Sequence, residues 1–230
     1  MGKVVIFDWG GVILHNYLVD NNDNQAIIRT IKSFNPNLTD EESWNIYRKT
    51  LPDEFGVYIS EQDDLVSKTK WVKWLSQAGN FNTSVEEFAK RFSEEYLKTG
   101  YYKELVDYIH SLKRFCKIGL FSDLIFCCYE ALDKQVDLSQ FNYVWLSYLI
   151  HQKKTSEEAF IIAENDMQVP PEEILFIDDT TTNIKNAQKR GWNTCQALGY
   201  EFYKIKDTIE KFLNISEKTN PNIRIKQRNK

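Results

Sequence analysis

The feature that most constrains the fold lies near the N-terminus, where an apolar run ends in one carboxylate and two glycines. Residues 4–7 read Val-Val-Ile-Phe, followed by Asp8, Trp9, Gly10 and Gly11. A continuous apolar run rich in Val predicts a strand buried on both faces, as in parallel sheets. Ligands bind at the carboxyl ends of such strands, so Asp8 stands where a catalytic group would lie and the glycines allow close backbone approach. An ordinary strand followed by a loop with a solvated Asp fits this stretch equally well.

Beyond residue 100 the chain alternates between apolar runs and amphipathic segments. Strands are predicted at 116–121, 143–147, 174–177 and 193–196, and helices at 104–112, 124–132, 156–162, 183–190 and 203–213. Strands that alternate with helices predict an α/β fold, here a doubly wound parallel sheet with a Rossmann-like core and right-handed crossovers.

Residues 17–98 lack strand-like runs and carry several helical patterns instead. Three pairs have the spacing of a helix-capping box, namely Thr39 with Glu42, Ser60 with Asp63, and Ser84 with Glu87. This region therefore predicts an all-helical block inserted directly after the first strand. From residue 216 to 230 the chain is polar, basic and poor in apolar residues, which predicts a flexible tail.

Composition limits the partners. The formal net charge of −4 and the pI near 5.5 argue against a general nucleic-acid binder. We find no apolar run of the roughly 18 residues that a membrane span needs, so no membrane partner is expected. The four cysteines, at 116, 127, 128 and 195, form no Cys-x-x-Cys pair and read as reduced thiols. We expect a cytoplasmic protein, either a monomer or a homodimer.

Four polar clusters follow the predicted strands or lie in the loop beyond one: Asp8, Ser122, Lys153-Lys154 and Asp178-Asp179. In a parallel sheet these ends converge on one edge. Carboxylates, a hydroxyl and an ammonium together suit Mg²⁺ and a phosphate group. Each cluster alone has an ordinary structural explanation, since Ser122 could cap a helix and the Lys and Asp pairs could be solvated. Their joint occurrence favours the chemical interpretation.

The chain resembles the haloacid dehalogenase superfamily of hydrolases with a helical cap. Four ordered motifs carry the resemblance: Phe-Asp-x-x-Gly-Val with Asp8; the strand that ends in Ser122; Ser147-Tyr148 through Lys154 to Glu158 and Phe160; and Ile174 through Asp178-Asp179 to Asn183, continuing to Gly191-Trp192. The resemblance implies an α/β core at 1–14 and 99–215, with the helical cap at 15–98.

The resemblance also implies roles for individual residues. Asp8 would attack phosphorus to give an aspartyl-phosphate, so that a small phosphorylated metabolite, in one reading a sugar phosphate, loses its phosphate. Lys154 would neutralise charge on Asp8 and the phosphate. The phosphate-binding set would be Ser122, Asp123, Lys154 and Gly11, and the Mg²⁺ ligands would be Asp8, the Gly10 carbonyl, Asp178 and Asp179.

Three positions depart from the family pattern. Gly10 stands where most phosphatases of the family have a second Asp that acts as general acid and base. The missing proton donor would cost roughly 10²–10⁴ in rate for a substrate with a poor leaving group. Asp123 stands where Asn is more usual, and we expect its carboxylate to face away from the phosphate because of repulsion. Thr155 replaces a common Pro after the lysine.

Two alternatives stay open. Dehalogenases and phosphonate-cleaving hydrolases of the superfamily also lack the second Asp. The phosphonate branch needs a cap lysine, however, and none of the four lysines considered for this role has a matching context (Lys49, Lys68, Lys70, Lys73). Gly10 also allows a catalytically weakened module that binds Mg²⁺ or phosphate and serves regulation.

Overall fold

The fold is known from a computed structural model that describes residues 2–15, 23–51, 59 and 62–215. The predicted tail at 216–230 and Ser60 lie outside the described residues. No helix within these described ranges is both long and apolar enough to cross a membrane.

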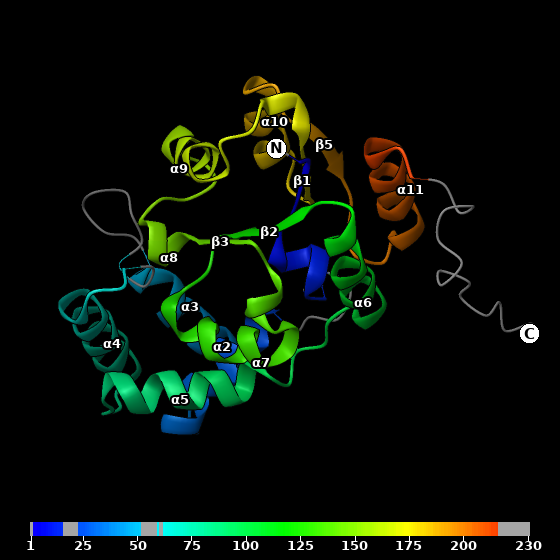
Figure 1. Ribbon diagram of the computed structural model, residues 1–230. Coiled ribbons are helices and arrows are strands. Elements are labelled where there is room, and N and C mark those ends of the chain that lie inside the picture. Colours follow the sequence, from blue (N-terminus) through cyan, green and yellow to red (C-terminus); the bar gives the residue numbers. More distant parts are fainter. Residues whose placement is uncertain (1, 16–22, 52–58, 60–61, 216–230) are drawn as a thin grey trace, which may run out of the picture.

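A five-stranded parallel sheet forms the centre of the molecule (Figure 1). Its strands are β1 (Val4–Phe7), β2 (Lys117–Ser122), β3 (Tyr143–Leu146), β4 (Ile174–Asp178) and β5 (Asn193–Gln196), in the order β3-β2-β1-β4-β5. The first strand therefore lies in the middle, where Phe7 is paired with Leu120 on one side and Ile177 on the other. The predicted α/β class and doubly wound parallel sheet are confirmed.

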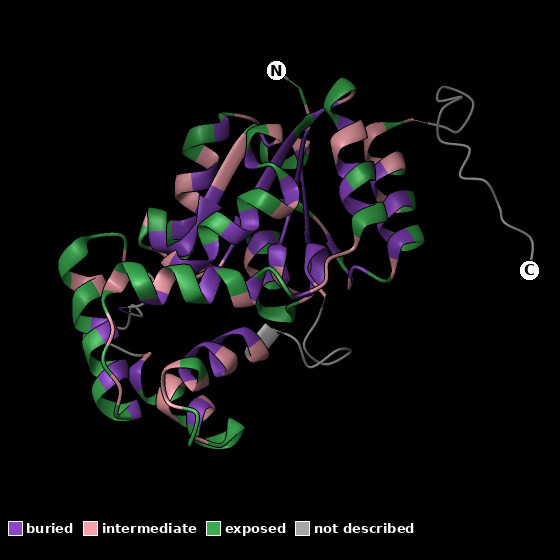
Figure 2. Ribbon diagram, turned by 90° about the horizontal axis from the view of Figure 1, so that it is seen from below, coloured by how far each residue is buried: buried purple, intermediate pink, exposed green. Residues whose placement is uncertain are grey.

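Helices cover both faces of the sheet, and residues along β1 alternate between the two apolar clusters. Val4 and Ile6 pack on the side of α9 (Glu157–Met167) and α10 (Thr181–Lys189), whereas Val5 and Phe7 pack on the side of α6 (Lys103–Ser111), α7 (Tyr129–Val136) and α11 (Phe202–Leu213). The strands are buried between these layers, while the outer helix faces are exposed (Figure 2). This double coverage explains why the strands read as continuous apolar runs.

Short elements connect the layers. They are η1 (Trp9–Ile13), η3 (Leu112–Arg114), η4 (Phe126–Cys128), η5 (Leu138–Gln140), α8 (Ser147–Ile150) and η6 (Pro171–Glu173). The helix predicted from residue 124 begins later, with η4 and then α7. The Leu124 N–H donates to Ser147 Oγ at 2.9 Å, so residue 124 is linked to the residue that follows β3 and does not begin a helix.

Within the described residues, four α-helices lie between η1 and α6, and we call them the cap helices: α2 (Asp23–Phe34), α3 (Asp40–Thr50), α4 (Leu65–Gly79) and α5 (Val85–Tyr96). Thr39 and Glu42 form the expected capping box of α3, and the Ser84 side chain caps α5. The predicted start of α4 at Ser60 and Asp63 is wrong, because Asp64 caps this helix by accepting the Ser67 N–H at 2.9 Å.

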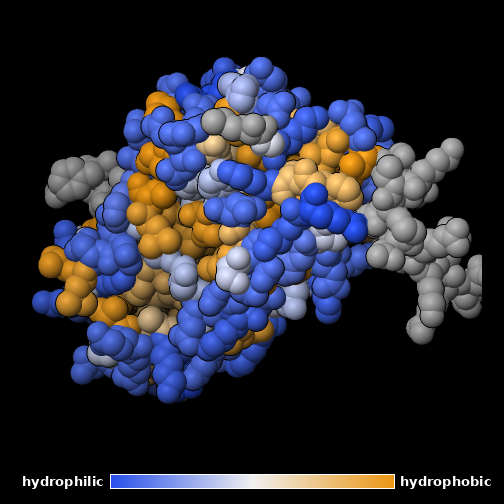
Figure 3. All heavy atoms as spheres, in the orientation of Figure 1, coloured by the Kyte–Doolittle hydropathy of each residue, from blue (hydrophilic) through white to orange (hydrophobic). Residues whose placement is uncertain are grey.

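The cap helices and the sheet share one apolar cluster. The buried Trp71 ring of α4 meets the Phe126 ring of η4 edge-on, with centroids 5.9 Å apart. The two chain crossovers lie side by side, since Leu14 bridges Tyr101 and the His15 N–H donates to the Gly100 carbonyl at 2.9 Å. Figure 3 shows apolar surface over α4, which exposes Leu65, Val66 and Trp74.

Candidate active site

Asp8 lies directly after the central strand and is almost fully buried. Its N–H donates to the Ile177 carbonyl at 2.9 Å, which ties the residue to the end of β4. Its side-chain Oδ1 accepts the Trp9 N–H at 2.6 Å. The backbone on both sides of Asp8 therefore fixes the direction of its carboxylate.

Lys154 brings a positive charge to the same edge of the sheet. Its Nζ lies 2.7 Å from Asp8 Oδ1 and 2.7 Å from Asp178 Oδ2, and the residue is 1% exposed. Its backbone is held on two sides, because its N–H donates to Asp123 Oδ1 at 3.0 Å and its carbonyl accepts from Asn186 Nδ2 at 3.1 Å. The Asp123 carboxylate therefore binds the backbone of the loop that carries Lys154.

Asp178 ends β4 with no exposed surface and is surrounded by donors. Asn183 Nδ2 donates to both of its carboxylate oxygens, at 3.2 and 3.0 Å, and the Thr180 N–H donates to Oδ1 at 2.7 Å. Together with the Lys154 ammonium these bonds satisfy a buried carboxylate, which would otherwise be costly.

Asp179 lies against the glycine turn that follows Asp8. Gly11 has φ +75°, a conformation that favours glycine, and a Cβ there would lie 2.6 Å from Asp179 Oδ2. Gly11 therefore permits the close approach of Asp179 to the loop after β1. Gly10 brings no side chain, so the carboxylate typical of this position is absent.

Ser122 is the last residue of β2 and is 2% exposed. The register that pairs Phe7 with Leu120 sets Ser122 just beyond Asp8, at the same edge of the sheet. The strand ends thus bring together Asp8, Ser122, Lys154, Asp178 and Asp179, which the sequence separates by up to 171 positions (179 − 8).

Burial controls the protonation of this cluster. Burial raises the pKa of the Asp8 carboxyl to about 8; the Lys154 charge acts against this shift and the Asp178 charge adds to it. Burial, followed by the Asp178 charge, also raises the pKa of Asp179. Burial alone would lower the pKa of Lys154, but the charges of Asp8, Asp178 and Asp123 outweigh it and raise that pKa.

The donor set suits a divalent cation. Asp8, Asp178 and Asp179 each offer one oxygen, and these three oxygens all lie within 4.8 Å of one another. With all three carboxylates ionised and Lys154 protonated, the cluster carries −3 + 1 = −2 charges. A hard cation with oxygen ligands, such as Mg²⁺, matches this charge and chemistry.

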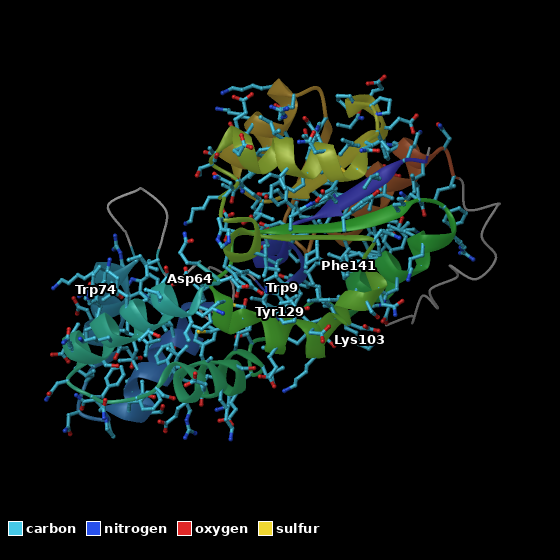
Figure 4. The ribbon with its side chains drawn as sticks, turned by 60° about the vertical axis from the view of Figure 1, so that its left-hand side comes forward. Trp9, Asp64, Trp74, Lys103, Tyr129 and Phe141 are labelled. Carbon is cyan, nitrogen blue, oxygen red and sulfur yellow. The ribbon has the colours of Figure 1, made fainter. Side chains whose placement is uncertain are left out.

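Several contacts of the site escaped prediction from the sequence. Asn183 and Thr180 lie within the fourth motif of the sequence, but their hydrogen bonds to Asp178 were not predicted. The hydrogen bond from Trp9 Nε1 to the Tyr96 hydroxyl, 2.9 Å long, joins the loop after β1 to cap helix α5 and had no signal in the sequence. Figure 4 shows Trp9 between the sheet and the cap helices.

Comparison with known proteins defines the class. Residues 3–190 match the family of haloacid dehalogenase-like hydrolases, and the chain therefore belongs to this family. The chain is 26% identical to the D-ribitol-5-phosphate phosphatase of Bacteroides thetaiotaomicron over 208 residues, which covers 85% of this chain and 92% of the relative.

Solved structures with the same fold include two bacterial proteins. A predicted hydrolase of the family from Porphyromonas gingivalis superposes with a TM-score of 0.67 at 20% identity, covering 94% of this chain and 100% of that one. A family enzyme of Bacteroides thetaiotaomicron, in complex with magnesium and inorganic phosphate, gives 0.66 at 20% identity, covering 86% and 96%.

Proposed function

We propose that this hydrolase is a Mg²⁺-dependent phosphatase that removes phosphate from a small phosphorylated metabolite. The observation that carries the proposal is the Lys154 ammonium, buried 2.7 Å from both Asp8 and Asp178 with Asp179 alongside. Phosphoryl transfer depends mainly on positioning and on charge stabilisation, and this cluster offers both. The matched family and the phosphatase relative support the same reaction class.

In the proposed reaction an Asp8 carboxylate oxygen attacks phosphorus and the bond to the alcohol oxygen of the substrate breaks. The leaving oxygen takes a proton from water, because Gly10 has no side chain to donate one. Water then attacks the aspartyl-phosphate, so that inorganic phosphate leaves and Asp8 is restored. Lys154 neutralises charge throughout, and the Ser122 hydroxyl donates to a phosphoryl oxygen.

The metal ligands in this proposal are Asp8, Asp178, Asp179 and the Gly10 carbonyl. When bound, Mg²⁺ supplies positive charge next to the phosphoryl oxygens. The chain's own part is to hold the ligands, and the bonds from Asn183 and Thr180 to Asp178 do this directly. Such supporting contacts orient ligands and tune their affinity for the metal.

For the substrate we propose a sugar or alditol phosphate. The relative that hydrolyses D-ribitol 5-phosphate covers most of the chain and supports this choice. Residues 15–98 form the proposed cap over the sheet edge that carries Asp8, and residues 1–14 and 99–215 form the proposed core.

The test is phosphate release from an aryl phosphate and from a panel of sugar and alditol phosphates that includes D-ribitol 5-phosphate. The wild-type chain and Asp8→Asn are compared with Mg²⁺ and with EDTA. We expect Mg²⁺-dependent release that the Asn variant loses. Release that is independent of metal, or equal in the variant, contradicts the proposal.

The absence of an acid at Gly10 favours a second candidate, a phosphate-binding regulatory module with weakened catalysis. A beryllofluoride adduct on Asp8 without turnover on any substrate would support this candidate. The dehalogenase alternative is disfavoured by the retained Asp178 and Asp179, because dehalogenases need no metal. Halide release from a 2-haloacid would support the dehalogenase alternative. Borohydride trapping of the enzyme with phosphonoacetaldehyde would support the phosphonate-cleaving alternative.

A further inference from the structure

The loop after β1 has a side-chain anchor in the cap. The Trp9 indole Nε1–H donates to the Tyr96 hydroxyl at 2.9 Å, and the two residues are 0% and 3% exposed. Trp9 follows Asp8, whereas Tyr96 is the last residue of α5, 87 positions further along the chain. Removing one partner of a buried hydrogen bond costs free energy, because the other polar group loses that bond. The bond therefore favours one relative position of Trp9 and Tyr96.

The anchored residue is the one whose backbone holds Asp8. The Trp9 N–H donates to Asp8 Oδ1 at 2.6 Å, the same oxygen that lies 2.7 Å from Lys154 Nζ. A shift of Trp9 would therefore lengthen one of the two bonds that orient the Asp8 carboxylate. The path from Tyr96 to Asp8 contains a single residue.

The loop needs such an anchor because two glycines follow Trp9. Gly10 and Gly11 have more backbone freedom than other residues, and Gly11 already adopts φ +75°. The Trp9 side chain is thus the last one before the flexible part of the turn. Its position determines where the turn begins.

Tyr96 is itself held in place on the cap side. The Phe92 ring stacks on its ring at 5.4 Å, and the preceding Glu95 pairs with Arg29 of α2 at 2.8 Å. Arg29 also donates to the Glu95 carbonyl at 3.0 Å. Through these contacts, the position of the cap helices sets the position of the Tyr96 hydroxyl, which binds the loop after β1.

We propose that Tyr96 is a positioning residue, which sets the orientation of the Asp8 carboxylate through the Trp9 indole. This inference rests on the proposed function for its kinetic consequence, since Asp8 is the proposed nucleophile. The structural part of the inference is that the position of the Trp9 backbone depends on Tyr96, and this part can be tested without measuring catalysis.

The experiment compares Tyr96→Phe with Tyr108→Phe in the full chain. Tyr108 is a buried tyrosine whose hydroxyl has no hydrogen-bond partner among the described residues, so its variant controls for loss of a buried hydroxyl. With an aryl phosphate we expect Tyr96→Phe to lower kcat about 10-fold, less than the roughly 10²-fold cost of a 1 Å misplacement. We expect KM to stay within about 2-fold, the pattern of a transition-state interaction.

Two further measurements complete the test. The double variant Trp9→Phe with Tyr96→Phe should lower kcat no more than Trp9→Phe alone, because each change removes the same hydrogen bond between the two side chains. The Trp9 backbone amide, followed by ¹⁵N NMR, should shift in Tyr96→Phe and stay in place in Tyr108→Phe.

Equal kcat values for Tyr96→Phe and Tyr108→Phe would overturn the inference, and so would an unmoved Trp9 amide. If the wild-type chain shows no turnover that Asp8→Asn abolishes, the proposed function fails instead. The amide shift alone then decides whether Tyr96 positions the loop.

Discussion

The Asp8 carboxylate and the Lys154 ammonium lie 2.7 Å apart, with side chains only 8% and 2% exposed. The ammonium is shared with Asp178, and Asp179 lies nearby, so one positive charge faces three carboxylates. Water screens such a buried cluster poorly, and its excess negative charge controls both stability and ligand binding.

The first prediction concerns pH and the metal-free protein. Burial raises the pKa of Asp8 from 3.8 to about 8, so between these values the folded state binds more protons than the unfolded state. Stability therefore falls as pH rises through this window. Asp8→Asn removes the titrating group, and its melting temperature should exceed that of the wild type by an amount that grows from pH 4 towards pH 8.

Thermal unfolding in EDTA at several pH values checks this expectation. For a chain of this size each kcal/mol corresponds to roughly 2–4 °C. A difference between the two proteins that is constant across the window would contradict it. Mg²⁺ should raise the melting temperature of the wild type at pH 8 more than that of Asp8→Asn, because the variant loses a charged ligand.

The second prediction concerns Lys154. Lys154→Met leaves Asp8 and Asp178 without their buried partner, and we expect a loss of about 3–5 kcal/mol in the free energy of unfolding. Phosphate release should fall with it. Denaturant unfolding at neutral pH measures the first effect.

Lys185→Met is the control, because this lysine lies on the exposed face of α10 and outside the cluster. Its stability should change by no more than about 0.5 kcal/mol. An equal loss in the free energy of unfolding for the two variants would contradict a stabilising role of the Lys154 ion pairs.

The central strand and the carboxylates at strand ends could be predicted because each depends on local sequence. An apolar run such as residues 4–7 needs burial on both faces, and a parallel sheet brings its strand ends to one edge. The order β3-β2-β1-β4-β5 brings Ser122 and Asp178 to either side of Asp8, as this reasoning requires.

Other features depend on contacts that the sequence does not encode locally. Asp64 rather than Ser60 caps α4, because both residue types suit an N-cap and the local sequence alone does not select between them. Asp123 contacts the Lys154 amide 31 positions away, and Trp9 contacts Tyr96 across 87. No periodicity or motif signals such pairs.

The third prediction concerns Asn183, which donates to both oxygens of Asp178 and is 6% exposed. Asn183→Ala removes these bonds and frees the carboxylate to rotate. Loss of such a supporting contact typically costs 10–100-fold in metal affinity. We expect the Mg²⁺ concentration for half-maximal phosphate release to rise by about this factor.

A Mg²⁺ titration of phosphate release measures the effect, with the exposed Asn82→Ala as control. Unchanged Mg²⁺ dependence in Asn183→Ala would show that Asp178 needs no support from this side chain, or that it does not bind the metal.

The last prediction concerns the glycine turn. Gly11→Ala adds a Cβ that would lie 2.6 Å from Asp179 Oδ2, at a backbone with φ +75°. Backbone strain at a positive φ costs on the order of 1–3 kcal/mol, and Asp179 must move to make room. We expect lower stability together with a weaker response to Mg²⁺. Gly2→Ala, whose Cβ meets nothing within 4 Å, should leave both unchanged. Calorimetry with and without Mg²⁺ separates the two effects, and a Gly11→Ala protein that matches Gly2→Ala in both would refute the role of the turn.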